Sequence, residues 1–344
     1  MEGLSNALIN HGPVKVFADN HEHAENYDQN SKLNIERISG FKIFRKYRKA
    51  NLINEFLKQN NIRAIFFDHW KSLENLNENV LSNTPTFCLV HSKEINHPVN
   101  THLNKRMIKS LDKARYIVAN SNFTKNLAIS LGAKRNKVYV IHPGSNYPID
   151  VKEEYSQKAI EIYGDSFPKI ITIARLDKRK NHQNVLMCVK NLKSKFPKIK
   201  YISIGDGSER KNIEQLKNEL DLKKEVDLLP QINEELKVAL LNNSDLFLMP
   251  SIIHKKSVEG FGIAYIEAAQ YGIPSIGGKD GGASDAIIHE KTGLICDGNN
   301  LDDVYSSIDQ IFKENKYFEY GKAAKENSSN FNWDKIIESY KRIL

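Results

Sequence analysis

The chain has 344 residues, 40% of them hydrophobic and 27% charged, which suits a globular protein with two domains of ordinary size. It has no run of about twenty apolar residues and no apolar signal-peptide core at its start, so we expect no membrane-spanning helix and a cytoplasmic protein. The formal net charge of +8 predicts an anionic partner, which could be a nucleotide sugar, a lipid headgroup surface or nucleic acid.

The first twenty residues predict a helix that ends at Gly12 and a short strand, VKVFA. Residues 37–49, RISGFKIFRKYRK, are basic and carry Phe41, Phe44 and Tyr47 at helical spacing. Such a segment either packs its aromatic side chains on a sheet or touches an anionic membrane or an acidic acceptor. We favour packing on the sheet, because an α/β fold is expected to have a helix here.

Two apolar segments, IRAIFFDHW and TPTFCLVHSKE, predict successive buried strands of an α/β sheet. Ligands of such sheets collect at the C-terminal ends of strands, so His69 and His91 lie where an acceptor could be reached. We favour a functional role for His91 and a structural role for His69. The three cysteines have no metal-ligand spacing and are expected to be buried apolar residues: Cys88, Cys188 and Cys296.

Residues 114–146 predict a strand, a capped helix and a second strand. Residues 147–167 are polar and lack a strand pattern, as a linker between two domains would. From Pro168 strands and helices alternate regularly, which predicts a parallel sheet with right-handed crossovers. The predicted strands are KIITIAR, IKYISIGDG, EVDLLP and DLFLMPS, and the predicted helices are HQNVLMCVKNLKSKF, KNIEQLKNELDL and ELKVALLNNS.

The last of these strands leads into residues 249–269, where a Gly-Phe-Gly turn precedes an apolar helix that contains one carboxylate, Glu267. Burial of that carboxylate without a partner would be costly. Glu259 stands earlier in the segment, about 12 Å away at ~1.5 Å per residue, which is roughly the span from ribose to hexose in a nucleotide sugar. The helix start between them favours a phosphate, and Gly260 and Gly262 allow close backbone approach.

The segment EGFGIAYIE resembles the two-glutamate motif of the retaining glycosyltransferases of family 4, which have the two-domain GT-B fold. The resemblance implies that Glu259 meets the transferred sugar and that Glu267 holds the ribose hydroxyls of the donor. It also implies that the turn and the helix start line the donor site with Gly260, Phe261, Gly262 and Ile263.

The segment ARLDKRKN resembles the family's Gly-Arg-Leu…Lys-Gly motif, which implies that Arg175 and Lys180 clamp the donor diphosphate. Fixed cations at this position would stabilise the charge that the leaving diphosphate gains. Two residues depart from the motif, because Ala174 and Asn181 replace the usual glycines. Neither departure removes a charged group.

His91 resembles the histidine at a strand end that the family places near the transferred sugar. The loop GDGSER is not a dinucleotide fingerprint, because Arg210 takes the place of the third glycine. The resemblance implies that this loop lies near the donor base and that a later glycine pair faces the donor phosphates. A turn with positive φ would explain either glycine of that pair equally well. The glycines concerned are Gly205 and Gly207 in the loop, and Gly281 and Gly282 in the pair.

The resemblance implies an α/β fold of GT-B architecture, in which two Rossmann-like domains face a cleft. Residues 1–150 would form the acceptor-side domain and residues 168–328 the donor domain, with a final helix at 331–344 that packs back on the first domain through Trp333. In the family a first strand and a glycine turn precede the helix with which this sequence starts. We therefore expect the N-terminal sheet to lack its first strand, and we expect a chain shortened in this way to have doubtful activity.

The implied activity is transfer of a hexose from a nucleoside diphosphate sugar to a hydroxyl of a glycan or lipid-linked acceptor, with retention at the anomeric carbon. Polysaccharide and lipopolysaccharide synthesis at the inner face of the cell membrane would fit. No cofactor and no essential metal are expected, because Arg175, Lys180 and the helix start carry the positive charge.

Three alternatives remain open. A sugar-nucleotide epimerase shares the fold, and a non-catalytic or truncated partner subunit would fit the missing strand. A nucleic-acid binder rests on charge alone and is not expected, because no groove-reading helix or aromatic platform is evident.

Overall fold

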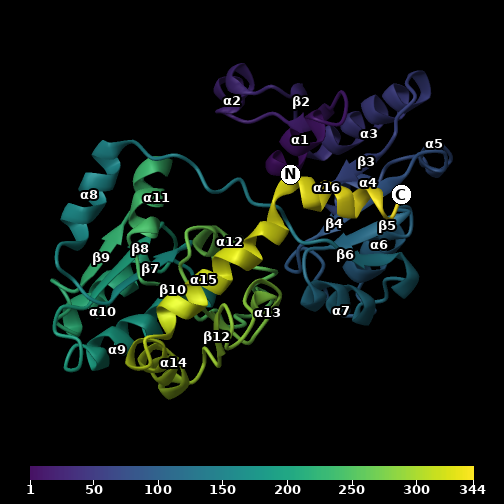
Figure 1. The fold of residues 1–344 in the computed structure, drawn as a ribbon. Helices are drawn as coiled ribbons and strands as arrows, with labels where there is room; N and C mark the ends of the chain where they lie inside the picture. The colour runs from purple at the N-terminus through teal and green to yellow at the C-terminus, as the bar shows by residue number, and fades with distance from the viewer. The chain divides into compact units, whose positions relative to one another are not determined.

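The computed structural model describes residues 1–344 as two compact units. The N-terminal unit comprises Met1–Gly144 and Asn332–Leu344, and the C-terminal unit comprises Ser145–Phe331 (Figure 1). All strand pairs in both units are parallel and helices connect them, so the predicted α/β class is confirmed. No helix is both long enough and apolar enough to cross a membrane.

The C-terminal unit contains one six-stranded sheet in the order β12-β11-β10-β7-β8-β9. The predicted alternation of strands and helices after Pro168 is confirmed. The strands are β7 (Lys169–Ile173), β8 (Lys200–Ile204), β9 (Val226–Leu229), β10 (Leu246–Met249), β11 (Ser275–Gly278) and β12 (Gly293–Cys296). The helices are α8 (Glu153–Tyr163), α9 (His182–Leu192), α10 (Arg210–Glu219), α11 (Glu234–Asn242), α12 (Ile263–Gln270), α13 (Ala283–Ala286), α14 (Leu301–Lys313) and α15 (Lys316–Ser328).

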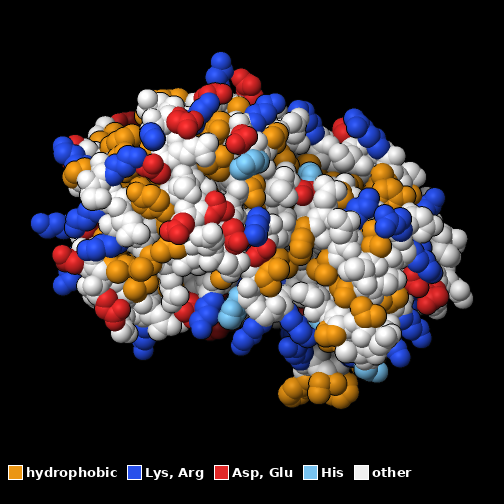
Figure 2. Space-filling model, turned by 90° about the horizontal axis from the view of Figure 1, so that it is seen from below, with side chains coloured by type: hydrophobic (Ala, Val, Ile, Leu, Met, Phe, Trp, Pro, Cys, Tyr) orange, Lys and Arg blue, Asp and Glu red, His pale blue; other side chains and the backbone are white.

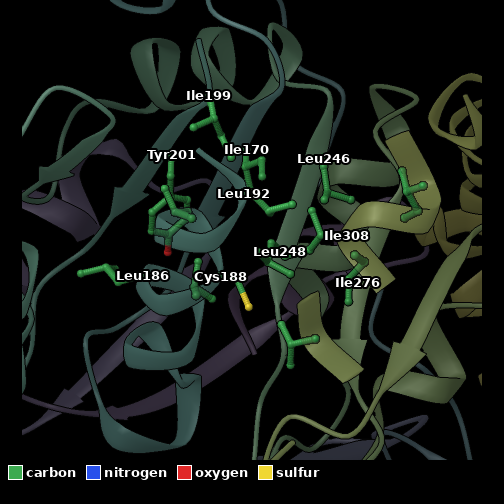
Figure 3. Packing of buried hydrophobic residues seen from close by; sticks show 14 of the residues in the cluster. Ile170, Leu186, Cys188, Leu192, Ile199, Tyr201, Leu246, Leu248, Ile276 and Ile308 are labelled. Atoms are coloured by element: carbon green, nitrogen blue, oxygen red, sulfur yellow. The ribbon is translucent and has the colours of Figure 1, made fainter. Parts of the chain in front are cut away.

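Helices cover both faces of this sheet, and neighbouring residues of a strand pack on opposite faces. Ile170 packs with α9, α10 and α14, whereas Ile171 packs with α8, α11 and α12. Figure 3 shows the first of these layers, where Tyr201 and Cys188 lie among aliphatic side chains. Burial on both faces explains why the strands read as continuous apolar runs rather than as alternating ones. All three cysteines are free and buried, as predicted.

Part of the predicted linker is a packed helix. Residues 147–167 lack a strand pattern, but Glu153–Tyr163 form α8, which packs on α11. Ala159 and Tyr163 are buried in the core, and their spacing of four residues places them on one face of the helix. The many polar residues of the segment cover its other face, which is why the composition resembled that of a linker.

The N-terminal unit has a four-stranded sheet, β3-β4-β5-β6, and a separate two-stranded sheet, β1-β2. The strands are β1 (Lys15–Asp19), β2 (Asn34–Ile38), β3 (Ile65–Phe67), β4 (Thr86–Val90), β5 (Tyr116–Ala119) and β6 (Val138–Val140). The helices are α1 (Glu2–Ile9), α2 (Ala24–Asn30), α3 (Lys42–Gln59), α4 (Trp70–Leu73), α5 (Glu78–Leu81), α6 (His102–Leu111), α7 (Asn122–Ser130) and α16 (Trp333–Lys341).

Strands β1 and β3 are edge strands of two separate sheets. β1 pairs only with β2, and β3 pairs only with β4, so neither strand has a backbone partner on its other side. This division agrees with the expectation that the sheet lacks a central strand.

Helix α16 returns to the N-terminal unit and packs on α1, as predicted for the final helix. Ile336, Ile337 and Tyr340 contribute to a core cluster with residues of β4 and β5. The indole ring of Trp333 lies against Gly3 and Gly144, where an added Cβ would come within 2.4 and 2.5 Å of ring atoms. Gly144 directly precedes the C-terminal unit in the sequence and Trp333 follows it, so the two ends of the connection to that unit are in contact.

The basic aromatic segment forms a helix, but its packing differs from the favoured prediction. In α3 only Ala50 and Ile53 are buried. Phe41 is 83% exposed and Phe44 is 64% exposed, so the aromatic side chains do not pack on the sheet. The contacts of α3 with the core come from the second half of the helix, including the ring contact of Phe56 with Phe17.

Candidate active site

The candidate site lies at the C-terminal ends of the strands of the C-terminal unit. Arg175 follows β7, Gly205 follows β8 and Ser251 follows β10. Because these strands are parallel and adjacent in the sheet, their C-terminal ends lie at the same edge. This edge is where ligands of open α/β sheets bind.

A buried ion cluster joins the loop after β7 to the loop after β10. Nη1 of Arg179 lies 2.6 Å from Oε2 of Glu259, and Nζ of Lys180 contacts the same oxygen. The three side chains are only 10 to 11% exposed. Oγ of Ser251 lies 3.5 Å from that oxygen as well. The contacts of the Glu259 carboxylate with these side chains all involve Oε2, and none involves Oε1.

The electrostatics of the cluster favour an additional anion. Burial raises the pKa of Glu259, but Lys180 and Arg179 outweigh this effect and hold it below its usual value. Burial lowers the pKa of Lys180, and the charge of Glu259 opposes that shift. Within the buried cluster, Arg179 and Lys180 face the single carboxylate of Glu259, which leaves an excess of one positive charge. A buried excess charge is costly unless a counter-ion binds.

The two predicted cations occupy different environments. Lys180 belongs to the buried cluster, whereas the side chain of Arg175 is 68% exposed and pairs with Asp177 at 3.2 Å. Arg179, which the sequence reasoning missed, takes the buried place beside Lys180. The run Lys178-Arg179-Lys180 was the available signal, but the sequence does not indicate which of its members are buried. In the structure Lys178 is exposed and the other two are buried.

Asn181 explains how the loop tolerates the loss of its usual glycine. The residue has φ 60° and ψ 35°, in the left-handed region that asparagine adopts more readily than most residues. Its buried Nδ2 donates to the backbone oxygens of Pro250 at 3.2 Å and Gly298 at 2.6 Å. The replacement therefore keeps the turn and adds two hydrogen bonds across the site.

The predicted glycines are sites of close backbone contact. A Cβ on Gly205 would lie 2.1 Å from the oxygen of Ala174, and one on Gly207 would lie 2.4 Å from the oxygen of Leu176. The GDG loop thus packs directly on the loop that carries Arg175. The structure gives Gly205 and Gly207 this packing role, and their predicted nearness to a donor base stays a prediction.

The glycine pair after β11 packs on Glu259. The backbone N–H of Gly282 donates to the oxygen of Glu259 at 2.9 Å. Gly281 has φ +104°, and a Cβ there would lie 2.3 Å from the same oxygen. These two residues fix the backbone of Glu259, and their predicted contact with donor phosphates stays a prediction.

The start of α12 combines a turn that requires glycine with buried apolar residues. Gly262 has φ +87° and is the N-cap, and a Cβ there would lie 2.4 Å from the ring of Tyr265. Phe261 is 2% exposed, and its ring centroid lies 5.7 Å from that of Phe331. Ile263 is partly buried against the same cluster. Phe261 and Ile263 therefore support the turn from the core side, and Gly260 precedes them in the same turn.

Glu267 is a partly buried carboxylate without a hydrogen-bond or ion-pair partner in the structure. Burial raises its pKa, while Lys237 acts against that shift and Glu234 adds to it. A carboxylate in this state can accept hydrogen bonds from a ligand without first breaking a contact within the protein. This property agrees with the predicted role at the ribose hydroxyls, which stays a prediction.

A buried polar network lies beside the loop that carries Arg179 and Lys180. The hydroxyl of Tyr201 donates to Oγ1 of Thr172 at 2.9 Å and lies 3.2 Å from Nδ1 of His182. Oγ of Ser203 lies 3.3 Å from the same nitrogen. Burial lowers the pKa of His182 to about 4, so the ring is neutral near pH 7. His182 is the first residue of α9 and follows Lys180 by two positions.

The two strand-end histidines belong to the N-terminal unit. His69 caps α4, because its side chain accepts from the backbone N–H of Lys71 at 3.0 Å, in agreement with a structural role. His91 follows β4 directly, and its backbone N–H donates to the carboxylate of Glu94. Burial lowers the pKa of His91, while Glu94 opposes this effect. Its predicted place beside the transferred sugar stays a prediction.

Comparison with known structures identifies the fold. A glycosyltransferase from Rickettsia africae aligns with 99% of this chain and 92% of its own at a TM-score of 0.79 and 19% identity. HepE of Anabaena, solved in complex with UDP, aligns with 99% of this chain and 95% of its own at a TM-score of 0.79 and 16% identity. The fold is that of the GT-B glycosyltransferases, with two Rossmann-like domains.

The sequence families agree with the fold. Residues 152–330 match the family described as "Glycosyl transferases group 1", and residues 1–146 match "Glycosyltransferase Family 4". The chain therefore belongs to the group 1 glycosyl transferases.

Among curated relatives, a GDP-mannose-dependent alpha-(1-6)-phosphatidylinositol monomannoside mannosyltransferase of Mycolicibacterium smegmatis is 26% identical over 149 residues. That match covers 43% of this chain and 39% of the relative.

Proposed function

We propose that the protein is a retaining glycosyltransferase, which moves a hexose from a nucleoside diphosphate sugar to a hydroxyl group. The buried cluster of Arg179, Lys180 and Glu259 carries this proposal, because it holds an excess positive charge beside a carboxylate whose Oε1 takes no part in these contacts. A donor diphosphate supplies the missing negative charge, and a sugar hydroxyl donates to Oε1 of Glu259. The partnerless carboxylate of Glu267 accepts hydrogen bonds from the ribose.

In this proposal the reaction keeps the configuration of the anomeric carbon. The bond between C1 of the hexose and the phosphate oxygen breaks, and the acceptor oxygen forms its bond to C1 on the same face. The acceptor proton passes to the leaving phosphate oxygen. Arg175, Arg179 and Lys180 stabilise the charge that gathers on the diphosphate, which is the role that a divalent ion has in other transferases.

The proposed acceptor is a hydroxyl of a glycan or of a lipid-linked sugar at the inner face of the cell membrane. The name of the Mycolicibacterium relative gives GDP-mannose as a donor and a phosphatidylinositol mannoside as an acceptor, and HepE was solved with UDP. GDP-mannose and UDP-glucose are therefore the first donors to test.

Calorimetric titration of the full chain with GDP-mannose, UDP-glucose, GDP and UDP tests the donor site. We expect saturable binding of one nucleotide class, which Arg175→Ala and Glu267→Ala each weaken by more than about tenfold. Lys178→Ala is the matched control for Arg175, because Lys178 is an exposed cation of the same loop with no ion pair. Absence of binding by folded protein would refute the donor site.

Incubation with the bound donor then separates transfer from the alternative reactions. A glycosyltransferase consumes the donor only with an acceptor, whereas an epimerase converts the sugar nucleotide without one. Binding of the donor with neither reaction would favour a non-catalytic subunit.

A further inference from the structure

Helix α3 exposes an apolar surface that the glycosyl transfer reaction does not explain. Phe41 is 83% exposed, Ile43 72%, Phe44 64% and Tyr47 49%. These four residues lie within seven positions of the chain, at the N-cap and in the first two turns of the helix. Large apolar patches on monomeric proteins usually mark an interaction site. We call the four residues the aromatic surface of α3.

The aromatic surface is separate from the face by which α3 packs on its own unit. The packing face is formed by Ala50, Ile53 and Phe56, all in the second half of the helix. Ile43 and Tyr47 are four residues apart, and Phe44 and Tyr47 are three apart, so these side chains are neighbours on the helix surface. The first turns of α3 therefore present a continuous apolar face to solvent.

Cations surround the aromatic surface. Six Lys and Arg residues and no acidic residue lie between Arg37 and Lys49. Arg37 pairs with Asp28, while Arg45 and Lys49 pair with Asp19, so six positive charges face two negative ones. No acidic side chain pairs with the remaining three, which are Lys42, Lys46 and Arg48.

The contacts of these three cations keep them beside the aromatic rings. Nζ of Lys46 lies 4.8 Å from the ring centroid of Tyr47. Nη1 of Arg48 donates to the backbone oxygen of Ser39 at 2.7 Å, which fixes the guanidinium next to the start of the helix. On the face of the molecule drawn in Figure 2, blue side chains are spread widely rather than gathered in one patch. The net charge alone therefore does not locate a binding surface, and α3 is distinguished by the combination of cations with exposed aromatic residues.

We propose that the first half of α3 docks the protein on membranes that contain anionic phospholipids. The aromatic surface enters the boundary between headgroups and acyl chains, and Lys42, Lys46 and Arg48 lie at the level of the lipid phosphates. Charge complementarity favours an anionic bilayer over an apolar protein groove, because a groove would leave these three cations without counter-charges. The proposal rests on α3 alone and does not depend on the proposed transferase activity.

Flotation of the full chain with lipid vesicles tests this proposal. We expect binding to phosphatidylcholine vesicles that contain about one third phosphatidylglycerol, and at least about tenfold weaker binding to pure phosphatidylcholine. The double variant Phe41→Ser/Phe44→Ser and the double variant Lys42→Gln/Lys46→Gln should each reduce binding by about tenfold or more. The matched controls are Phe318→Ser, a 70% exposed phenylalanine of the other unit, and Lys211→Gln/Lys223→Gln, which remove two exposed cations there.

An insertion measurement provides a second readout. Tyr47→Trp should show a blue-shifted emission with anionic vesicles and quenching by brominated acyl chains, relative to the wild type with its two tryptophans. Failure to bind anionic vesicles, or binding that both α3 double variants retain, would overturn the proposal. A third outcome would also overturn the proposal. If the wild type formed a dimer that Phe41→Ser/Phe44→Ser dissociates, and did not bind vesicles, the aromatic surface of α3 would bind a second copy of the chain instead of a membrane.

Discussion

Nη1 of Arg179 lies 2.6 Å from Oε2 of Glu259, although the two residues are 80 positions apart in the sequence. This ion pair joins the loop after β7 to the loop after β10, and Lys180 contacts the same carboxylate oxygen. The contact brings the two predicted motifs of the C-terminal unit into one charged cluster. It also leaves two buried cations for one carboxylate, and the first prediction follows from this ratio.

Glu259→Gln should destabilise the protein more than Lys180→Met. The first variant leaves Arg179 and Lys180 buried without a counter-charge, which should lower the free energy of unfolding by about 3–5 kcal/mol. The second variant keeps one cation paired with one carboxylate and replaces the lysine stem with an apolar chain of similar length. Urea unfolding of both variants measures the difference, and equal losses would contradict the assignment of the excess charge to this cluster.

Tyr201→Phe should weaken both stability and donor binding. Loss of the hydroxyl removes one hydrogen bond from Thr172 and one from His182, which keep their contacts with Leu248 and Ser203, so the free energy of unfolding should fall by about 0.5–1.5 kcal/mol. Because His182 starts α9 just after Lys180, the donor dissociation constant should rise several-fold. Tyr163→Phe is the matched control, since the buried hydroxyl of Tyr163 has no hydrogen-bond partner. A similar loss in both variants would show that packing, and not the network, is responsible.

Asn181→Ala should destabilise the protein more than Asn181→Gly. Both variants lose the hydrogen bonds to the backbone oxygens of Pro250 and Gly298. Only alanine adds the penalty for a Cβ in the left-handed region, which is roughly 1–2 kcal/mol per residue. Thermal or urea unfolding of the pair measures this difference directly. If alanine were tolerated as well as glycine, the loop would have to adopt another backbone conformation.

Glu267→Gln should stabilise the free protein while it weakens donor binding. The raised pKa of Glu267 means that the folded state disfavours the ionised carboxylate. The wild type therefore loses stability as pH rises from the ordinary glutamate value through the folded-state pKa, and the variant does not. Unfolding measured at about pH 8 and about pH 5 should show a gain for Gln that shrinks at the lower pH. A destabilised variant at the higher pH would indicate that Glu267 has an internal partner.

Removal of divalent metal should leave the reaction intact. The proposed counter-charge for the leaving diphosphate comes from three side chains, Arg175, Arg179 and Lys180. Transfer rates measured with and without EDTA should therefore agree within about twofold. A rate that falls with EDTA and returns with added magnesium or manganese would show that these cations are insufficient.

Much of the fold could be predicted because the sequence repeats one simple unit. The strands after Pro168 are buried on both faces, so they appear as short apolar runs separated by amphipathic helices. Lys180 and Glu259 could be placed in one site because each follows a parallel strand of the same sheet. The resemblance added the roles that spacing alone could not supply.

Other features depend on contacts that a local pattern does not encode. Arg175 and Arg179 are both loop arginines, and only the position of Glu259 determines which of them is buried. In α3 the aromatic residues have the spacing of a packing face, but Ala50 and Ile53 provide that face instead. The helix α8 was missed because polar residues outnumber the few side chains that it buries.

The unpaired edges of β1 and β3 have a consequence for the handling of the protein. An edge strand carries backbone N–H and C=O groups that can recruit a strand from another molecule. These two edges therefore give concentrated solutions a route to intermolecular sheet formation through the N-terminal unit, in addition to the outer edges that every open sheet has. Amide hydrogens of β1 and β3 should also exchange with solvent faster than those of β4 and β5, which have strand neighbours on both sides.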